Sequence, residues 1–340
     1  MLVPISVVIP AFNASAYLKA TIMSIRAQSI PVAEIIVIND GSTDNTGAIA
    51  KEAGVVVIDQ ENAGLPATRN RGIHAASQPW IALADADDLW EPDKIERQWR
   101  SLQLVPEAAF SFSDFSQFND RGIINRSVIH EVHQRHFRGV ARSPLGNEAF
   151  LCDSVTLGTA MLKQNPFCPS SLMVRRDTAV YLGGYDSSLL AGEDYDFVLR
   201  LTRDHVGTYI DVPLVRYRRH PTAMTSNIPR MREAMVDVAL RITRHSKEYS
   251  PDTSEYFRRR MSLYLLKCGF AHIRYGDQAA ARIWLQKSLN EKITFSAVAL
   301  YPVTFLVERG FGRYLRDAIV QLSGREAFKS AGHSNSAVSL

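Results

Sequence analysis

The stretch Trp80-Ile81-Ala82-Leu83-Ala84-Asp85-Ala86-Asp87-Asp88-Leu89-Trp90 places three carboxylates within four positions, directly after an apolar run. The run predicts a buried strand over residues 80–84, and open α/β sheets bind ligands at the carboxyl ends of their strands. Carboxylates this close repel one another unless a cation or hydrogen-bond donors lie among them. Divalent cations that also hold substrate phosphates are bound by such carboxylates. The stretch therefore indicates a metal site that grips a phosphorylated substrate; the alternative is an acidic turn that caps a helix beginning near Glu91.

The first 115 residues alternate strand and helix patterns. Apolar runs predict four strands, at residues 6–10, 34–39, 55–58 and 80–84. Helical patterns follow each of them: one begins near Tyr17, one is capped by Thr43 or Asp44, one starts at Pro66, and one covers residues 91–104. Continuous apolar strands that alternate with helices predict an α/β fold with a mostly parallel sheet flanked by helices.

The pattern changes after residue 115. Residues 116–165 are weakly periodic and carry His130, His133 and His136, which could face a metal from a helix. We expect instead that these are solvated residues of a variable loop, because nothing nearby completes a metal site. Strand and helix signals return over residues 170–217.

The domain prediction follows these changes and the helical pattern after Met231. We expect a catalytic domain over residues 1–229, with a nucleotide-binding half at 1–115 and an acceptor half at 116–229. A helical region at 230–322 and a flexible tail at 323–340 complete the chain.

Composition describes an ordinary globular chain of 340 residues, 46% hydrophobic and 22% charged. Its three cysteines are far apart, which argues against a disulfide framework. The N-terminus shows no basic segment followed by a cleavable apolar one, so we expect a cytoplasmic location.

Charge is unevenly spread. Residues 1–229 hold 21 Lys and Arg against 25 Asp and Glu, whereas residues 230–340 hold 18 against 10. The acidic part suits a metal site, and the basic part suits an anionic partner such as membrane phospholipid or a phosphate-linked acceptor. No nucleic-acid-binding motif accompanies the basic residues, so we expect no nucleic acid partner.

Polar residues follow two further strands. Asp40-Gly41 comes after the second strand, and Pro10-Ala11-Phe12-Asn13 covers the end of the first. Asp40 by itself reads best as part of a helix-capping turn, although its carboxylate can accept a hydrogen bond from a base or a ribose. Together with the triple carboxylate, three strand ends now offer polar groups at one edge of the sheet.

Six segments in one order resemble glycosyltransferase family 2, nucleotide-sugar-dependent enzymes of the GT-A fold. The resemblance covers about residues 5–226, with Thr68 as a mild departure where many relatives have alanine. The matching segments are Val7-Val8-Ile9-Pro10-Ala11-Phe12-Asn13; Ile38-Asn39-Asp40-Gly41-Ser42-Thr43-Asp44; Glu61-Asn62-Ala63-Gly64 with Thr68-Arg69-Asn70; Asp85-Ala86-Asp87-Asp88; Gly183-Gly184-Tyr185-Asp186; and Gly192-Glu193-Asp194-Tyr195-Asp196-Phe197-Val198-Leu199-Arg200-Leu201.

The resemblance implies a donor site. Asp40 would read the base, usually uracil; Asp85 would lie nearer the ribose and Asp87 nearest the cation. Mg²⁺ or Mn²⁺ would bridge the pyrophosphate and neutralise charge as the nucleoside diphosphate leaves. The nucleotide-binding residues implied are Pro10, Ala11, Phe12, Asn13, Asp40, Asn62, Asp85, Ala86 and Arg218.

Asp194 is similar to the family's catalytic base, and Glu193 beside it is the competing candidate. A positioned carboxylate can take the proton of the acceptor hydroxyl as that hydroxyl attacks the anomeric carbon. One carboxylate with a metal-assisted leaving group suits an inverting displacement, unlike the paired carboxylates of glycosidases. The alternative is an N-cap for a helix over residues 195–202, a position that would also keep Asp194 ionised.

Tyr217-Arg218-Arg219-His220 resembles the Arg-x-His segment that ends the catalytic domain of this family. His220 could be a third metal ligand beside Asp85 and Asp87, and Arg218 could hold diphosphate oxygens. The alternative for both residues is a structural role.

The resulting expectation is an inverting, metal-dependent glycosyltransferase. It would move a sugar from a nucleotide-sugar, a UDP-sugar on the family pattern, to a hydroxyl of a glycan or lipid-linked acceptor in bacterial polysaccharide synthesis. A nucleotidyltransferase is an alternative, although the chain lacks a glycine-rich basic loop near its N-terminus. A degenerate sugar-nucleotide-binding scaffold is the other, which the intact Asp40, Asp85, Asp87 and Asp194 argue against.

Residues 271–289 look like part of a tetratricopeptide-type helix pair with Gly276-Asp277 as its turn, and a single such unit forms no solenoid. Residues 297–307 are apolar except Thr304 and too few to span a bilayer. A buried helix is favoured there. The alternative is a peripheral contact with the anionic inner face of the cytoplasmic membrane, supported by the flanking Lys292, Arg309, Arg313 and Arg316.

The membrane alternative predicts that part of the protein sediments with membranes at low salt and is released at high salt, because screening weakens its attraction to anionic lipid. Fractionation of lysed cells measures this directly. Recovery of all the protein in the soluble fraction at low salt would contradict the prediction.

Overall fold

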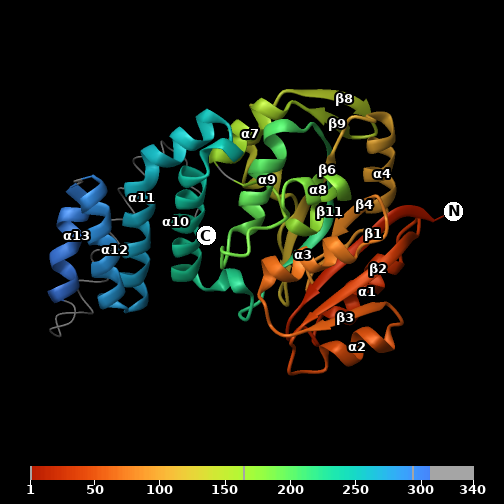
Figure 1. Ribbon diagram of the computed structural model, residues 1–340, viewed down its shortest axis with the longest axis horizontal. Helices are drawn as coiled ribbons and strands as arrows, with labels where there is room; N and C mark the ends of the chain where they lie inside the picture. The colour runs from red at the N-terminus through yellow and green to blue at the C-terminus, as the bar shows by residue number, and fades with distance from the viewer. Residues whose placement is uncertain (1, 164, 293–294, 307–340) are drawn as a thin grey trace. The chain divides into compact units, whose positions relative to one another are not determined.

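The computed structural model describes residues 2–163, 165–292 and 295–306 (Figure 1). The chain divides into two compact units. The first unit comprises Met1–Ser226 with Arg244–Ser254, and the second comprises Asn227–Thr243 with Glu255–Leu340. The segment Arg244–Ser254 therefore belongs to the first unit, although it lies within the C-terminal region that the sequence predicted to be helical.

One sheet runs through the first unit in the order β3-β2-β1-β4-β10-β6-β11-β9-β8, with β5 beside β11 and β7 beside β6. The four strands predicted from the apolar runs pair in parallel, as do β6 and β11; β10 lies antiparallel between β4 and β6. The strands are β1 Val3–Ala11, β2 Val32–Asp40, β3 Val56–Gln60, β4 Trp80–Leu83, β5 Leu89–Trp90, β6 Phe110–Asn119, β7 Gly122–Asn125, β8 Arg142–Gly146, β9 Ala149–Cys152, β10 Met173–Arg175 and β11 Gly207–Arg218.

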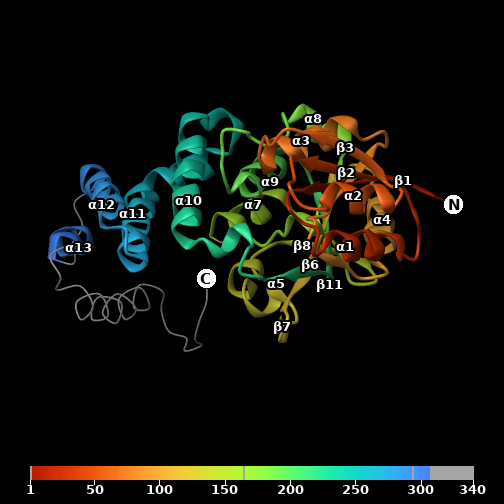
Figure 2. The same ribbon diagram turned by 90° about the horizontal axis from the view of Figure 1, so that it is seen from below.

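Helices cover both faces of this sheet (Figure 2). Val7 and Ile9 of β1 belong to one apolar cluster with Leu18 and Ile22 of α1. Val8 points to the opposite face, where it meets α3 so closely that a Cβ added at Gly72 would lie 2.2 Å from Val8 Cγ1. The helices of the first unit are α1 Leu18–Arg26, α2 Thr46–Glu52, α3 Leu65–Ala75, α4 Lys94–Leu104, α5 Val128–Glu131, α6 Gln134–Phe137, α7 Ser154–Lys163, α8 Arg176–Tyr181 and α9 Glu193–Asp204.

The expectation of a variable loop over residues 116–165 is wrong. This segment holds the end of β6, the β6–β7 hairpin, and α5, α6, β8, β9 and α7. Most of these elements are four or five residues long, too short for a periodic pattern to show in the sequence. The ring of His130 lies 2.5 Å from Asp211 Oδ1, and the side chain of His136 lies outside the described residues.

Two predicted helix starts shift. The helix expected from residue 91 begins at Lys94. Asn45, rather than Thr43 or Asp44, directly precedes α2, but the Asp44 carboxylate does accept a hydrogen bond from the Thr46 N–H at 3.0 Å. Asp44 therefore satisfies a free donor of the first turn from one position farther out.

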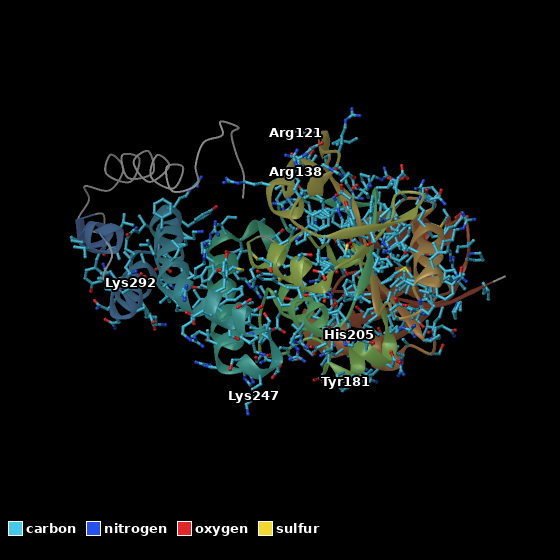
Figure 3. The ribbon with its side chains drawn as sticks, turned by 90° about the horizontal axis from the view of Figure 1, so that it is seen from above. Arg121, Arg138, Tyr181, His205, Lys247 and Lys292 are labelled. Carbon is cyan, nitrogen blue, oxygen red and sulfur yellow. The ribbon has the colours of Figure 1, made fainter. Side chains whose placement is uncertain are left out.

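The second unit is helical where it is described, with α10 Ile228–Arg244, α11 Pro251–Tyr275, α12 Gln278–Glu291 and α13 Phe295–Leu306. Gly276, at φ 91°, turns the chain between α11 and α12, and Asp277 caps α12 by accepting from the Ala280 N–H. Within the described residues, no helix is long and apolar enough to cross a membrane. Lys292, just after α12, is exposed (Figure 3), whereas Arg309, Arg313, Arg316 and the tail 323–340 lie outside the described residues.

Candidate functional site

The ends of β1 and β2 are joined by Asn13. This residue adopts the left-handed conformation, with φ 48°, which asparagine tolerates better than most side chains. Its Oδ1 accepts from the Thr43 N–H at 2.9 Å, and its own N–H donates to Ser42 Oγ at 3.0 Å. Phe12 beside it is 52% exposed, and Pro10 and Ala11 end the buried strand. The loops after β1 and β2, where the nucleotide is predicted to bind, are thus joined by hydrogen bonds.

Asp40 is buried and organises the neighbouring turn. Its Oδ1 accepts from the Ala63 N–H at 2.8 Å and from Gln60 Nε2 at 2.7 Å, and its Oδ2 accepts from the Gly64 N–H at 3.0 Å. Asn62 donates back to the Asp40 carbonyl at 3.1 Å. The turn around Asn62 is therefore held by Asp40, a structural role that differs in its partners from the helix-capping turn considered from the sequence.

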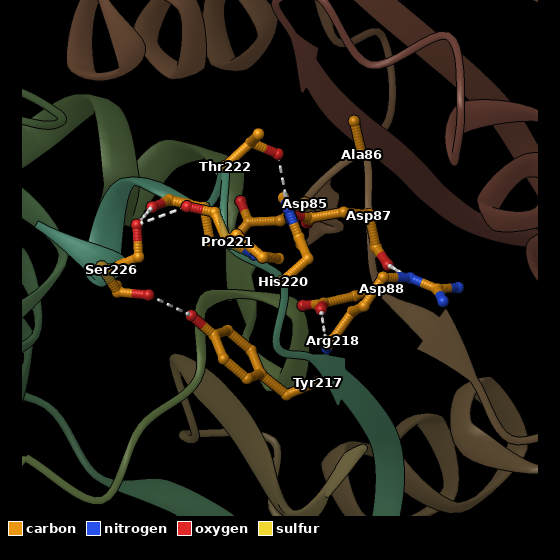
Figure 4. A network of polar contacts seen from close by, with 12 residues as sticks. Asp85, Ala86, Asp87, Asp88, Tyr217, Arg218, His220, Pro221, Thr222 and Ser226 are labelled. Carbon is orange, nitrogen blue, oxygen red and sulfur yellow. Dashed lines mark hydrogen bonds and ion pairs between the residues drawn. The ribbon is translucent and has the colours of Figure 1, made fainter. Parts of the chain in front are cut away.

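The three carboxylates after β4 occupy three different environments (Figure 4). Asp88 is fully buried, and accepts from the Arg218 N–H at 2.9 Å and from Ser170 Oγ at 2.6 Å. Burial, and then the charges of Asp87 and Asp85, raise the pKa of Asp88 well above its usual range. Asp88 ties the loop after β4 to β11 and to the 3-10 turn Pro169–Ser171, so it acts as a structural anchor.

Asp87 faces His220. Its Oδ2 lies 2.9 Å from His220 Nε2, and His220 Nδ1 lies 2.8 Å from Thr222 Oγ1 (Figure 4). Burial and the charge of Asp85 raise the pKa of Asp87, against the lowering effect of His220. An oxygen and a nitrogen ligand are thus adjacent where a cation would relieve the unfavourable burial of the carboxylate.

Arg218 is fixed beside the same pair. Its Nε donates to the Asp87 carbonyl at 2.9 Å. Its guanidinium lies 4.9 Å from the centre of the Tyr17 ring and 4.5 Å from that of Phe118. Two aromatic faces and one hydrogen bond therefore hold a positive charge next to the carboxylates.

Asp85 is engaged by Arg69, a residue to which the sequence interpretation gave no role. The side chain of Arg69 is 2% exposed; it donates to Asp85 Oδ1 at 2.7 Å and to Glu193 Oε1. Its guanidinium also lies 5.3 Å from the centre of the Tyr185 ring. The signal available in the sequence was a charged residue on the face of α3 that also carries the buried Pro66, Gly72 and Ile73.

Glu193 and Asp194 begin α9 after Gly192, whose φ is 78°. Glu193 is buried against Arg69, and its Oε2 has no hydrogen-bond partner among the described residues. Asp194 Oδ1 accepts from the Tyr195 N–H at 2.8 Å. Burial and the charge of Glu193 raise the pKa of Asp194 to about 7, the opposite direction to the lowering expected from the helix terminus. Desolvation outweighs the helix dipole here.

The predicted site residues thus fall into two hydrogen-bonded groups. One joins Asp87, His220, Arg218 and Asp88, and the other joins Asp85 to Glu193 through Arg69. Asp85 and Asp87 are separated only by Ala86, which is buried, so the groups meet at the loop after β4. The arrangement offers fixed positive charge, an adjacent carboxylate and imidazole, and a carboxylate of raised pKa.

Comparison with known proteins identifies this unit. The family model described as Glycosyl transferase family 2 matches residues 6–158. Residues 6–158 of the first unit thus carry the sequence pattern of glycosyltransferase family 2. The putative glycosyltransferase EpsH of Bacillus subtilis is 40% identical over 135 residues, which are 38% of this chain and 39% of EpsH. The putative teichuronic acid biosynthesis glycosyltransferase TuaG of the same organism is 34% identical over 132 residues, 37% of this chain and 52% of TuaG. The matched region thus spans about half or less of these relatives.

Two solved structures share the fold. Staphylococcus aureus TarS 1–349 in complex with UDP has a TM-score of 0.56 at 15% identity and covers 91% of each chain. The mannosyltransferase PcManGT from Pyrobaculum calidifontis, in complex with GDP-Man and Mn²⁺, has a TM-score of 0.56 at 15% identity, over 93% of this chain and 84% of that one. The predicted GT-A fold, with its mainly parallel sheet flanked by helices and its helical C-terminal region, is confirmed.

Arg69→Gln is expected to lower the free energy of unfolding by about 3–5 kcal/mol, because it leaves two buried carboxylates without their cation. Chemical denaturation followed by circular dichroism measures the change. Arg71→Gln, an exposed position on the same helix, is the matched control and should change stability by no more than about 0.5 kcal/mol. Equal effects of the two substitutions would show that the Arg69 ion pairs contribute nothing specific.

Proposed function

We propose that the protein is an inverting, metal-dependent glycosyltransferase. It transfers a sugar from a nucleotide-sugar, with UDP as the nucleotide, to a hydroxyl of a bacterial glycan or lipid-linked acceptor. The observation that carries the proposal is the cation-binding pair Asp87 and His220 beside Arg218, in a family 2 fold that also presents Asp194 with a pKa of about 7. The nucleotide-sugar complexes of TarS and PcManGT support the donor class.

The donor would lie across the ends of β1, β2 and β4. Pro10, Ala11, Phe12, Asn13 and the turn at Asn62 would line the base and ribose, with Asp40 accepting from the base. Asp85 and Ala86 would contact the ribose side of the diphosphate. Arg218 would hold diphosphate oxygens, since its guanidinium is already positioned by Tyr17 and Phe118.

The residues present suit Mg²⁺ or Mn²⁺. Asp87 would be the principal ligand, with His220 beside it and Asp85 on the far side of Ala86; carboxylate and imidazole ligands fit Mn²⁺ particularly well. When bound, the cation supplies neutralisation of the charge on the leaving diphosphate. The raised pKa of Asp87 supports this, because a cation would offset the desolvation and the Asp85 charge that raise it.

Asp194 would accept the proton of the acceptor hydroxyl. A base works best when its pKa lies near the working pH, and burial and Glu193 bring the pKa of Asp194 there. Glu193 is the weaker candidate because Arg69 occupies one of its oxygens. We assign Glu193 the role of tuning Asp194, with Arg69 linking both to the donor edge through Asp85.

Binding of UDP with Mn²⁺ is expected to raise the Tm, because a ligand that binds only the folded state stabilises it. Thermal shifts with UDP, GDP, CDP and dTDP, each with Mn²⁺ or with chelator, identify the nucleotide. Asp87→Asn should remove the metal-dependent part of the shift, while the exposed control Asp120→Asn should keep it. If GDP alone stabilised the protein, the donor would carry GDP in place of UDP. If none of the four diphosphates stabilised it, the degenerate scaffold would be favoured.

Asp194→Asn is expected to lower turnover by about 10²–10⁴-fold while the nucleotide-induced thermal shift is unchanged, since only proton transfer is lost. In the unmodified enzyme kcat/KM should fall about tenfold per pH unit below pH 7, because a protonated Asp194 cannot act as base. Initial rates of nucleotide release measure both.

The matched control for Asp194→Asn is Asp177→Asn. Asp177 also lies in the first turn of a helix, α8, and accepts from the N–H of the residue that follows it. Its replacement should leave turnover and the pH profile unaltered. Full turnover by Asp194→Asn would assign the base to another residue.

A further inference from the structure

Three potential metal ligands converge in the second unit, apart from the predicted donor site. They are Glu233 of α10 and Cys268 and His272 of α11, and one ligand atom of each lies within 4.8 Å of the other two. Cys268 and His272 are four residues apart, so they share one face of α11. Cys268 is fully buried and His272 is 7% exposed, whereas the side chain of Glu233 is 38% exposed and leaves the group open to solvent on one side.

Both ring nitrogens of His272 have a carboxylate nearby, as the nitrogens of metal-binding histidines often do. His272 Nε2 lies 2.9 Å from Glu233 Oε1, and its Nδ1 lies 3.7 Å from Asp277 Oδ2. Asp277 is itself fixed, because it caps α12. In metal sites a carboxylate near the second ring nitrogen sets the tautomer and orientation of the imidazole. Asp277 is in place for that role whether Glu233 contacts the imidazole directly or through an ion.

The donor set selects the metal. Thiolate, imidazole and carboxylate together suit Zn²⁺, whereas Mg²⁺ and Ca²⁺ prefer oxygen alone. In a tetrahedral zinc site the sulfur and nitrogen ligands lie about 3.6 Å apart, so the group needs to contract by about 1 Å or less. Asp237 follows Glu233 by one turn of α10, and water can complete the fourth position.

Two carboxylates place negative charge near the Cys268 thiol. Burial and the nearby Glu233 and Asp237 raise the pKa of the Cys268 thiol to about 12. A bound divalent cation would offset these carboxylates and deprotonate the thiol.

We propose that Glu233, Cys268 and His272 bind one Zn²⁺ ion that joins α10 to α11. The ion would replace the direct Glu233–His272 contact and cross-link two helices of the second unit. This site is independent of the proposed transferase activity, because it uses none of the residues assigned to the donor or the acceptor.

Cobalt substitution tests the proposal, since Co²⁺ enters zinc sites and a thiolate ligand gives it a charge-transfer absorption in the near ultraviolet. Titration of the metal-free, full-length protein with Co²⁺ should produce this band together with visible bands, saturating near one equivalent, and Zn²⁺ should remove them. The proposed cation ligands of the donor site, Asp85, Asp87 and His220, include no thiol, so Co²⁺ bound by them alone gives no such band. A folded wild-type protein without the thiolate band at saturating Co²⁺ would overturn the proposal without any variant.

Two cysteine variants locate the site. Cys268→Ser should abolish the charge-transfer band, while Cys152→Ser, which removes another buried thiol whose pKa is also about 12, should retain it. His272→Gln should weaken Co²⁺ binding at least tenfold. Asp87→Asn should leave the band intact, which separates this result from any failure of the donor site. Loss of the band in Cys152→Ser with retention in Cys268→Ser would refute the assignment.

Discussion

The buried guanidinium of Arg69 holds together the two acidic segments of the site. It lies between Asp85, which follows β4, and Glu193, the first residue of α9, two segments 108 residues apart in the chain. Without that cation, two carboxylates could not approach each other in a region of low dielectric. The position of α9, and with it Asp194, therefore depends on a charge that comes from α3. The same arrangement places Glu193 where it raises the pKa of its neighbour.

The repulsion among the three carboxylates after β4 is offset by a different partner for each of them. Asp85 has an arginine, Asp87 has a histidine, and Asp88 has a backbone N–H and a serine hydroxyl. The histidine that faces Asp87 is itself a good metal ligand. The three carboxylates are thus suited to different tasks: one links the two halves of the site, one is suited to a cation, and one anchors β11 to the loop.

Much of this could be predicted, because its signals are local. Apolar runs located β1 to β4, and glycosyltransferase family 2 motifs located the residues at their ends. The strands and helices between residues 116 and 165 were not predicted, since most of them are too short to show a period. Arg69 was missed for a different reason. Its position on the face of α3 was the one local signal, and its partners, Asp85 and Glu193, are distant in sequence. The Glu233–Cys268–His272 group depends in the same way on the pairing of two helices.

The sequence alone determined the order of elements over the first 115 residues, the family resemblance and the identity of the acidic residues, because hydrophobic periodicity and short motifs act within a few residues. Only the tertiary structure decided what each acid does. It buried Asp40 against the Ala63 and Gly64 N–H groups, brought the pKa of Asp194 to about 7, and returned Tyr249 to the first unit, where its hydroxyl donates to Asp196. Burial and charge pairing are set by residues that meet only after folding, and these set the protonation state and function of a carboxylate.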